Sequence, residues 1–255
     1  MNESPDILLT NDDGIYAPGL LALHQALQGL GGLEVIAPDT ERSAAGHSIT
    51  MLHILRVLEV ERQGRPFGRA VNGTPADCVK LGLANLLPRP PRLIVSGINA
   101  GPNTGTNVLY SGTVSAAMEG AIYGVPSLAV SMGTLSSQHD YTTAAHFSRL
   151  VAERILARGL PPGIMLNLNV PTLPLEAIKG LRITRQAHYR YHDKYERRLD
   201  PRGREYFWLS LENVSVLDPS PDADAVAIAE GYVSLTPLSL DLTHRGFAQE
   251  LAAWF

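Results

Sequence analysis

The chain has 255 residues, 45% of them hydrophobic and 18% charged, which is enough to bury one large core. Its 21 basic and 25 acidic side chains give a formal net charge of -4, and no run of Lys or Arg is typical of a nucleic-acid surface, which disfavours a polymeric nucleic acid partner. The single Cys78 excludes an internal disulfide, the start MNESPD lacks a signal-peptide layout, and no apolar run could span a bilayer. We therefore expect a cytoplasmic protein with no membrane partner.

The first half of the chain alternates between strand and helix signals. Residues 7–9 form an apolar run typical of a buried strand, and Pro18 can open a helix that Gly31 and Gly32 end. Strands are predicted at 33–38 and 93–96, each beside a Pro or Gly. The apolar face of the first helix consists of Leu20, Leu23, Leu27 and Leu30.

Further elements continue this alternation. Residues 52–62 are predicted to be extended, and Thr74 is predicted to cap a helix over 74–87. A helix over 111–124, a strand over 126–132, a helix from its cap Asp140 to Gly159 and a strand over 163–171 follow. Such a succession predicts an α/β fold with a doubly wound, mostly parallel sheet.

The alternation of strand and helix signals ends near residue 175. Residues 1–175 are therefore predicted to form the catalytic core. Residues 176–255 are predicted to form a C-terminal arm and oligomerisation segment of the same compact domain. Residues 183–211 mix aromatic and charged side chains around the turn DPRG, which favours a β-hairpin arm that packs on another subunit. A short helix and a strand are expected within 222–238, and an amphipathic terminal helix over 244–255.

Oxygen-bearing side chains follow three of the predicted strands. Asp12 and Asp13 come directly after the first strand, Ser43 lies in the loop after the second, and Asn99 follows VSG at 95–97. The carboxyl ends of parallel strands meet at one edge of a sheet, where ligands bind. Two carboxylates, a hydroxyl and an amide oxygen are hard ligands that favour Mg²⁺ or Mn²⁺ over zinc. The sequence therefore predicts a divalent metal site at this edge.

A glycine-rich segment, GINAGPNTGTNVLYSGT, follows Asn99 and is predicted to bind phosphate. Glycines let a backbone approach a ligand closely, and the helix that begins near YSGT offers free N–H groups to an anion. The segment is neither a P-loop nor a dinucleotide-binding fingerprint. The predicted phosphate-binding residues are Gly101, Asn103, Gly105, Thr106, Asn107, Ser111, Gly112 and Thr113.

Each motif has an ordinary structural explanation when it is taken alone. A DDG after a strand is often a turn, and Asn/Gly clusters are often structural loops. Thr74 and Asp77 are sufficiently explained as helix caps, His47 as a hydrogen-bonded loop histidine, and Glu119 as a cap or ion-pair partner. Only the meeting of three loops at one edge favours the functional interpretation.

Five segments, taken in chain order, resemble the stationary-phase survival protein SurE family of nucleotidases over nearly the whole chain. They are LLTNDDGIYAPGL, APDTERSAAGHSIT, VNGTPADCV, VSGINAGPNTGTNVLYSGTVSAAMEG and LSLDLT. The resemblance implies a Rossmann-like core, metal-dependent hydrolysis of nucleoside 5'- and 3'-monophosphates, and a homodimer or homotetramer built partly by exchanged C-terminal segments. It also implies that Asp12, Asp13, Ser43 and Asn99 hold the metal and that the loop 103–113 holds phosphate.

Both lines of reasoning predict hydrolysis of a phosphate monoester. The cation would bind a phosphate oxygen and lower the pKa of a water for in-line attack, and Asp12 or Asp13 could take the proton of that water. A covalent aspartyl-phosphate route stays open, although the DxD spacing usual for it is absent. The base preference and the cleavage of short polyphosphates stay open as well.

Two other functions use the same residues. A nucleotide-binding sensor without turnover would need the same cradle, although a simple anion binder would place Lys or Arg there rather than two carboxylates. A sugar-nucleotide transferase also holds a metal between aspartates, but the sequence has no evident acceptor or sugar-contacting motif.

Overall fold

A nine-stranded sheet forms the centre of the computed structural model, which describes residues 5–133, 140–191, 194–210, 214–217 and 219–255. Residues 192–193 and 211 of the predicted arm lie outside the described residues. Across the sheet the strands are β3 (Val57–Arg62), β4 (Arg65–Val71), β2 (Leu33–Pro38), β1 (Ile7–Thr10), β5 (Leu93–Asn99), β6 (Ser127–Met132), β7 (Ile164–Val170), β13 (Val233–Ser239) and β8 (Leu181–Ile183).

Six neighbouring strands of this sheet, from β4 to β7, pair in parallel. Strand β3 is antiparallel to β4, and β13 is antiparallel to β7 and parallel to β8. Short apolar runs such as Ile7–Thr10 are fully buried because helices cover both faces of a parallel sheet. The prediction of an α/β fold with a doubly wound, mostly parallel sheet is confirmed.

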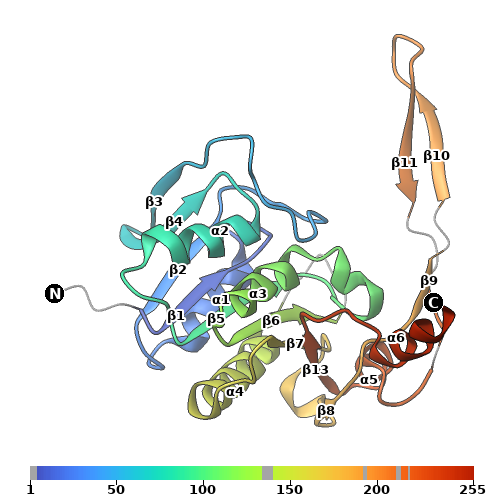
Figure 1. Ribbon diagram of the computed structural model, residues 1–255. Coiled ribbons are helices and arrows are strands. Elements are labelled where there is room, and N and C mark those ends of the chain that lie inside the picture. The colour runs from blue at the N-terminus through green and yellow to red at the C-terminus, as the bar shows by residue number, and fades with distance from the viewer. Residues whose placement is uncertain (1–4, 134–139, 192–193, 211–213, 218) are drawn as a thin grey trace.

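Helices pack on both faces of the sheet, as Figure 1 shows. Helices α1 (Pro18–Leu27) and α4 (Thr142–Arg158) pack on one face, where Leu20, Leu23 and Phe147 join the largest apolar cluster. Helices α2 (Pro75–Leu81) and α3 (Gly112–Ile122) pack on the other face. No described helix is long and apolar enough to cross a membrane.

Several predicted boundaries differ from the structure. Helix α1 ends at Leu27, because Gln28 leaves the helical backbone and Gly29 takes a positive φ of 84°. Leu30 therefore packs against the core from outside the helix. Helix α4 begins at Thr142, and Asp140 accepts the backbone N–H of Thr142 at 2.9 Å instead of occupying the cap position. The capping box at Thr74 is present as predicted.

Other differences concern element lengths. Strand β5 continues past residue 96 to Asn99, and the extended excursion at 52–62 is a strand only from Val57 onward. The strand β4 had no counterpart in the sequence prediction. The helix expected over 74–87 consists of α2 and a five-residue π-helical turn, Gly82–Leu86.

The last third of the chain adds β8 and β13 to the sheet, together with the short helix α5 (Asp224–Ala229). Strands β9 (Tyr189–Tyr191) and β12 (Val214–Val216) pair with each other. The predicted hairpin arm is present as β10 (Lys194–Leu199) and β11 (Glu205–Ser210), and it projects away from the sheet (Figure 1). The terminal helix is α6 (Arg245–Leu251).

Candidate active site

The two aspartates of NDDG lie where the sheet reverses its strand order. Strand β1 pairs in parallel with β2 on one side and with β5 on the other. The chain leaves β1 toward β2 and reaches β5 only later, so β1 and β5 flank the point where the strand order reverses, which is where ligands bind in open α/β sheets. Asp12 and Asp13 follow β1, and Asn99 ends β5 at the same edge.

Asp12 is buried against the N-terminus of α3. Only 4% of the residue is exposed, and the hydroxyl of Thr113 donates a hydrogen bond to its Oδ1. A Cβ atom on Gly112 would lie 2.7 Å from the Cβ of Asp12, so only glycine permits this approach. Burial raises the pKa of Asp12, while the hydrogen bonds from Thr113 oppose that rise.

Asp13 is less buried, and its pKa is raised to about 6. Burial is the main cause, and the negative charges of Asp12 and Glu41 add to it. The backbone N–H of Ala100, directly after β5, hydrogen-bonds to the Asp13 carboxylate and favours its charged form. The loops after β1 and β5 therefore meet at Asp13.

The surroundings of the two carboxylates fit a divalent cation. Within the described part of the chain, no Lys or Arg forms an ion pair with either aspartate, so their mutual repulsion has no compensating side chain. The Oδ1 atom of the neighbouring Asn11 is buried without a hydrogen-bond partner among the described residues. Oxygen atoms without a proton donor are the ligands that Mg²⁺ and Mn²⁺ prefer.

Ser43 and Asn99 hydrogen-bond to different neighbours. The hydroxyl of Ser43 donates to the carboxylate of Glu41 at 2.6 Å, and Glu41 in turn acts electrostatically on both aspartates. The amide nitrogen of Asn99 donates to the carbonyl of Gly101 at 2.8 Å, so its side-chain oxygen takes no part in that bond. Sequence reasoning missed Glu41, whose only signal is its place two residues before Ser43.

The loop that carries Ser43 is held on both sides by hydrogen bonds from distant elements. These bonds restrict where Ser43 can lie relative to the aspartates. They run from Arg42 N–H to the Asp12 carbonyl (2.7 Å), from Gly46 N–H to the Tyr110 carbonyl (3.1 Å), from the Thr50 N–H and hydroxyl to Asp77 (2.9 and 2.6 Å), and from the Thr74 hydroxyl to the Ser48 carbonyl (2.8 Å).

His47 and Glu119 form a further anchor of this loop. Glu119, buried on α3, contacts the Nε2 of His47 at 2.8 Å and the Nζ of Lys80 at 3.1 Å. The hydrogen bond with His47 lowers the pKa of Glu119. The structural explanations of His47 as a bonded loop histidine and of Glu119 as an ion-pair partner are therefore confirmed.

The residues predicted to hold phosphate fall into two groups. Gly112 and Thr113 lie beside Asp12, and the preceding Ser111 caps α3 because its hydroxyl accepts the N–H of Val114 at 3.1 Å. The N–H of Thr113 already hydrogen-bonds to Asp12 and that of Val114 to Ser111, so an anion at this helix end would be attracted mainly by the positive end of the helix dipole.

The second group anchors the loop to other parts of the fold. Asn103 donates from its side chain to Ser131 at 2.8 Å, and its backbone carbonyl accepts from Asn167 and Asn169 of β7 at 2.8 and 3.1 Å. A direct contact between the Asn103 side chain and phosphate stays a prediction. Gly101 accepts from Asn99, and the structure places Thr106 in the following 3₁₀ turn.

Gly105 and Asn107 bind the C-terminal third of the chain. The N–H of Gly105 donates to the buried carboxylate of Asp224 at 2.9 Å, and the Tyr191 hydroxyl donates to the side-chain oxygen of Asn107 at 2.8 Å. Asp224 also accepts the N–H of Ala187 at 3.0 Å. Sequence reasoning missed Asp224, because 119 residues separate it from Gly105 and no local pattern links them.

Comparison with known proteins places this geometry in a family. The model of the family described as Survival protein SurE matches residues 7–193, which include every site residue predicted from the sequence. The chain belongs to the SurE family. It is 55% identical to the 5'-nucleotidase SurE of Moorella thermoacetica, over 97% of this chain and 95% of that protein. It is 51% identical to the 5'-nucleotidase SurE of Heliobacterium modesticaldum, over 97% of this chain and 91% of that protein.

The fold matches a solved member of the SurE family as well. The crystal structure of the SurE protein from Aquifex aeolicus superimposes with a TM-score of 0.84 at 38% identity, over 97% of this chain and 98% of that chain. The family resemblance predicted from the five sequence segments is therefore confirmed.

Proposed function

We propose that this protein is a 5'-nucleotidase that uses a divalent cation to hydrolyse nucleoside monophosphates to nucleoside and phosphate. The observation that carries the proposal is the neighbouring pair Asp12 and Asp13, of which Asp12 lies against the N-terminus of α3 and Asp13 against the loop after β5, in a chain of the SurE family. The relatives named 5'-nucleotidase SurE are phosphoric monoester hydrolases, which supports the reaction class.

The carboxylates of Asp12 and Asp13, the hydroxyl of Ser43 and the side-chain oxygen of Asn99 would hold the cation. When bound, a divalent cation supplies charge neutralisation for the phosphate and lowers the pKa of a water molecule. Asp13 is the more accessible of the two carboxylates, so it is the group that can accept the proton of the attacking water. Asp12, held by Thr113 and by the end of α3, stays fixed during the reaction.

The protein itself would orient the phosphate. The positive end of the α3 dipole would attract phosphate oxygens, which offsets the negative charge that builds up during in-line displacement. Gly112 allows this helix end to approach Asp12 closely, and the anchored loop 100–110 forms the neighbouring wall. Substrate phosphate, attacking water and carboxylates would thus be held by groups that do not need to rearrange.

A phosphate-release assay with and without chelator tests this function. We expect the purified protein to release phosphate from nucleoside 5'-monophosphates with Mn²⁺ or Mg²⁺, and EDTA to abolish the release because the carboxylates then lack their counter-charge. Excess Mn²⁺ added after EDTA is the control and should restore the rate. Chelator-resistant turnover would contradict the metal assignment, and tight nucleotide binding without turnover would favour a sensor.

The family resemblance implies a wider range of substrates, which extends this proposal. Nucleoside 3'-monophosphates share the same phosphate monoester, and short polyphosphates share its charge, so both belong in the same assay panel. The cytoplasm stays the compartment that the sequence composition predicts. The choice between water attack and an aspartyl-phosphate intermediate is decided by the stereochemistry at phosphorus in a chiral substrate, because one in-line displacement inverts it and two successive displacements retain it.

We also propose that the hairpin arm joins subunits into a homodimer or homotetramer. In the register of β10 and β11, Tyr195 lies opposite Leu209, and Arg197 lies opposite Phe207. Opposite residues share a face of a hairpin, so Tyr195, Leu209 and Phe207 gather on one face together with Leu199, which lies opposite Glu205. Phe207 is 57% exposed and Tyr195 61% exposed in the single chain. An apolar surface of this kind is typical of an interface.

Replacing Tyr195 and Phe207 together with serine should lower the mass measured by light scattering. The change removes most of the aromatic area from that face while the hairpin hydrogen bonds remain, so the assembly loses its contact. Arg198→Ala, on the opposite face of the same hairpin, is the control and should leave the mass unchanged. An unchanged mass in the double variant would mean that this face does not join subunits.

A further inference from the structure

The loop 100–110 and the start of α3 form one segment whose two ends touch the candidate catalytic aspartates. The backbone N–H of Ala100 hydrogen-bonds to Asp13, and Thr113 hydrogen-bonds to Asp12. All the residues predicted to bind phosphate lie between Ala100 and Thr113 or at Thr113 itself. The place of these residues relative to the aspartates therefore depends on what holds the middle of the segment.

Gly105 lies in the middle of this segment, and side chains from the C-terminal third bind both of its backbone polar groups. Its N–H donates to the Oδ2 of Asp224 at 2.9 Å, and its carbonyl accepts from the Nε2 of Gln186 at 2.7 Å. The φ of Gly105 is 52°, and a Cβ atom there would lie 2.6 Å from the ring of Tyr189, so only glycine fits. Gly105 is thus fixed by three residues that come much later in the chain.

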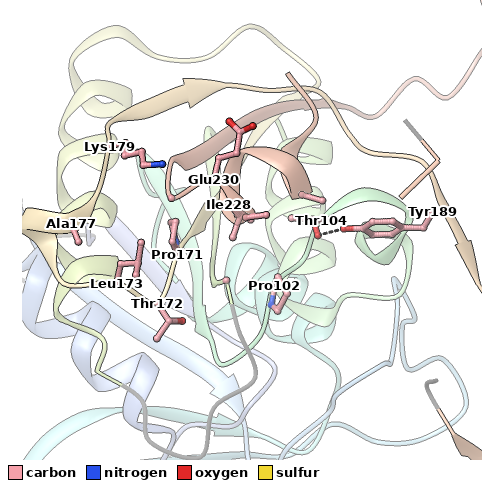
Figure 2. Close-up of a pocket in the computed structure, with 14 residues that line it drawn as sticks. Pro102, Thr104, Pro171, Thr172, Leu173, Ala177, Lys179, Tyr189, Ile228 and Glu230 are labelled. Carbon is pink, nitrogen blue, oxygen red and sulfur yellow. Dashed lines mark hydrogen bonds between the residues drawn. The ribbon is translucent and has the colours of Figure 1, made fainter. Parts of the chain in front are cut away.

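The neighbours of Gly105 are bound by the same part of the chain. The hydroxyl oxygens of Thr104 and Tyr189 lie 2.5 Å apart at the wall of the cavity drawn in Figure 2. The Tyr191 hydroxyl donates to the side-chain oxygen of Asn107 at 2.8 Å. The part of the loop from Thr104 to Asn107 is therefore bound to the C-terminal third at several points.

Asp224 is the buried charged group among these partners. The residue is 0% exposed, its Oδ1 accepts the N–H of Ala187 at 3.0 Å and that of Ala225 at 2.7 Å, and its Oδ2 accepts that of Gly105. Burial raises the pKa of Asp224, and the three backbone hydrogen bonds oppose that rise. A buried carboxylate costs free energy unless its hydrogen bonds are made, so Asp224 favours the arrangement in which Gly105 stays bound. Asp224 lies beyond residue 193, where the match to the SurE family model ends.

We propose that Asp224 and Gln186 are positioning residues for the hydrolysis of the phosphate monoester. Through Gly105 they hold the loop 100–110 in the place where it contacts the phosphate group of the substrate, so they strengthen phosphate binding without contacting phosphate themselves. The inference rests on the proposed nucleotidase function and on the proposed phosphate role of this loop.

The competing explanation is that the two side chains only stabilise the fold, and the kinetic constants separate the two explanations. Loss of folded protein lowers kcat, because fewer molecules are active, but it leaves KM unchanged. A displaced loop raises KM, because each active molecule then binds the phosphate group less tightly.

Asp224→Asn removes the bond to Gly105 selectively. An asparagine side chain has one oxygen that accepts hydrogen bonds and one NH₂ group that donates them. With its oxygen in the place of Oδ1, it still accepts from Ala187 and Ala225. Its NH₂ group then faces the N–H of Gly105, so two donors meet and the loop loses its acceptor.

Thr184→Val is the matched control. Thr184 is buried in the same third of the chain, and its hydroxyl bonds to Ser234 at 2.8 Å and to Thr236 at 2.7 Å. Valine keeps the shape of threonine and removes these buried bonds, neither of which reaches the loop 100–110. The control therefore weakens the C-terminal third without releasing the loop.

For each protein, kcat and KM are measured with nucleoside 5'-monophosphates, together with the inhibition constant of inorganic phosphate and the melting temperature. We expect Asp224→Asn to raise KM and the inhibition constant about tenfold, because a hydrogen bond to a charged group typically contributes at least that factor. Thr184→Val should leave both constants unchanged, even if its melting temperature falls as far. Unchanged constants in Asp224→Asn, or an equal rise in the control, would overturn the proposal.

Two further measurements keep the test decisive. If Asp224→Asn does not fold, Gln186→Ala takes its place with the same outcomes, because it removes the bond to the Gly105 carbonyl and leaves Asp224 intact. If the wild type releases no phosphate from any nucleotide, the nucleotidase function fails. Calorimetric titration of inorganic phosphate with saturating Mg²⁺ then decides on the loop, since weaker binding in Asp224→Asn than in Thr184→Val supports the proposal and equal or absent binding overturns it.

Discussion

Asp12→Asn and Asp13→Asn should each lower phosphate release by at least ~10²-fold, since removal of one preorganised electrostatic group at a reacting centre typically costs about 10²–10³ in rate. Asparagine keeps the shape of the side chain, so it can still accept from Thr113 or from the Ala100 amide. What it removes is the charge that a cation needs. The measurement is steady-state hydrolysis with saturating Mn²⁺, together with calorimetric titration of Mn²⁺ into each variant.

Thermal unfolding in EDTA separates this chemical effect from damage to the fold. Burial disfavours the charged form of both carboxylates in the folded protein, and the charge of Asp12 further disfavours the charged form of Asp13. Neutral asparagine should therefore leave the melting temperature unchanged or slightly higher. Asp222→Asn, at an exposed ion pair with Arg185, is the matched control and should affect neither activity nor metal binding. Near-normal turnover in both site variants would mean that NDDG is only a turn.

Ser43→Ala should be milder than either aspartate change. Ser43 is exposed and its hydroxyl is neutral, so water can take the place of its oxygen around a cation. The contrast between the serine and aspartate variants therefore measures how much of the site depends on charge rather than on oxygen atoms alone.

Local patterns were sufficient to predict the strands and helices that carry the aspartates. The apolar run at 7–9, the leucine spacing of α1 and the cap at Thr74 each act within a few residues, where side-chain period and capping decide the structure. The end of α1 was predicted too late because Leu30 continues the apolar pattern. Its burial is instead satisfied from the loop after the helix.

Contacts between distant segments could not be predicted in this way. Asn103 has the composition of an exposed polar loop, yet two asparagines of β7, 64 and 66 residues away, fix its carbonyl. Strand β13 pairs antiparallel to β7 at the end of a parallel sheet, and nothing in its own residues specifies that neighbour. Such partners are chosen by tertiary packing, so the anchoring role of Asp224 appears only in the folded chain.

Gly112 offers a test of the site that changes no charged or polar atom. In Gly112→Ala the new Cβ would lie 2.7 Å from the Cβ of Asp12 and 2.9 Å from its Oδ2, so either the carboxylate or the end of α3 must shift. A misplacement of about 1 Å at a catalytic group can cost ~10²-fold in rate, and we expect a loss of that order. The backbone of Gly112 does not have a positive φ, so alanine itself is not strained there.

Gly32→Ala is the matched control, because its new Cβ would meet no atom closer than 3.4 Å and its φ is also not positive. The two variants should unfold at similar temperatures if the fold absorbs the shift at α3, while only Gly112→Ala loses turnover and Mn²⁺ affinity. Alanine is a better helix former than glycine by about 1 kcal/mol. Any loss of turnover in Gly112→Ala would therefore come from the clash with Asp12 and not from helix propensity. Full activity in Gly112→Ala would show that catalysis does not need the close approach of α3 to Asp12, and the phosphate would then have to bind elsewhere along the loop 100–110.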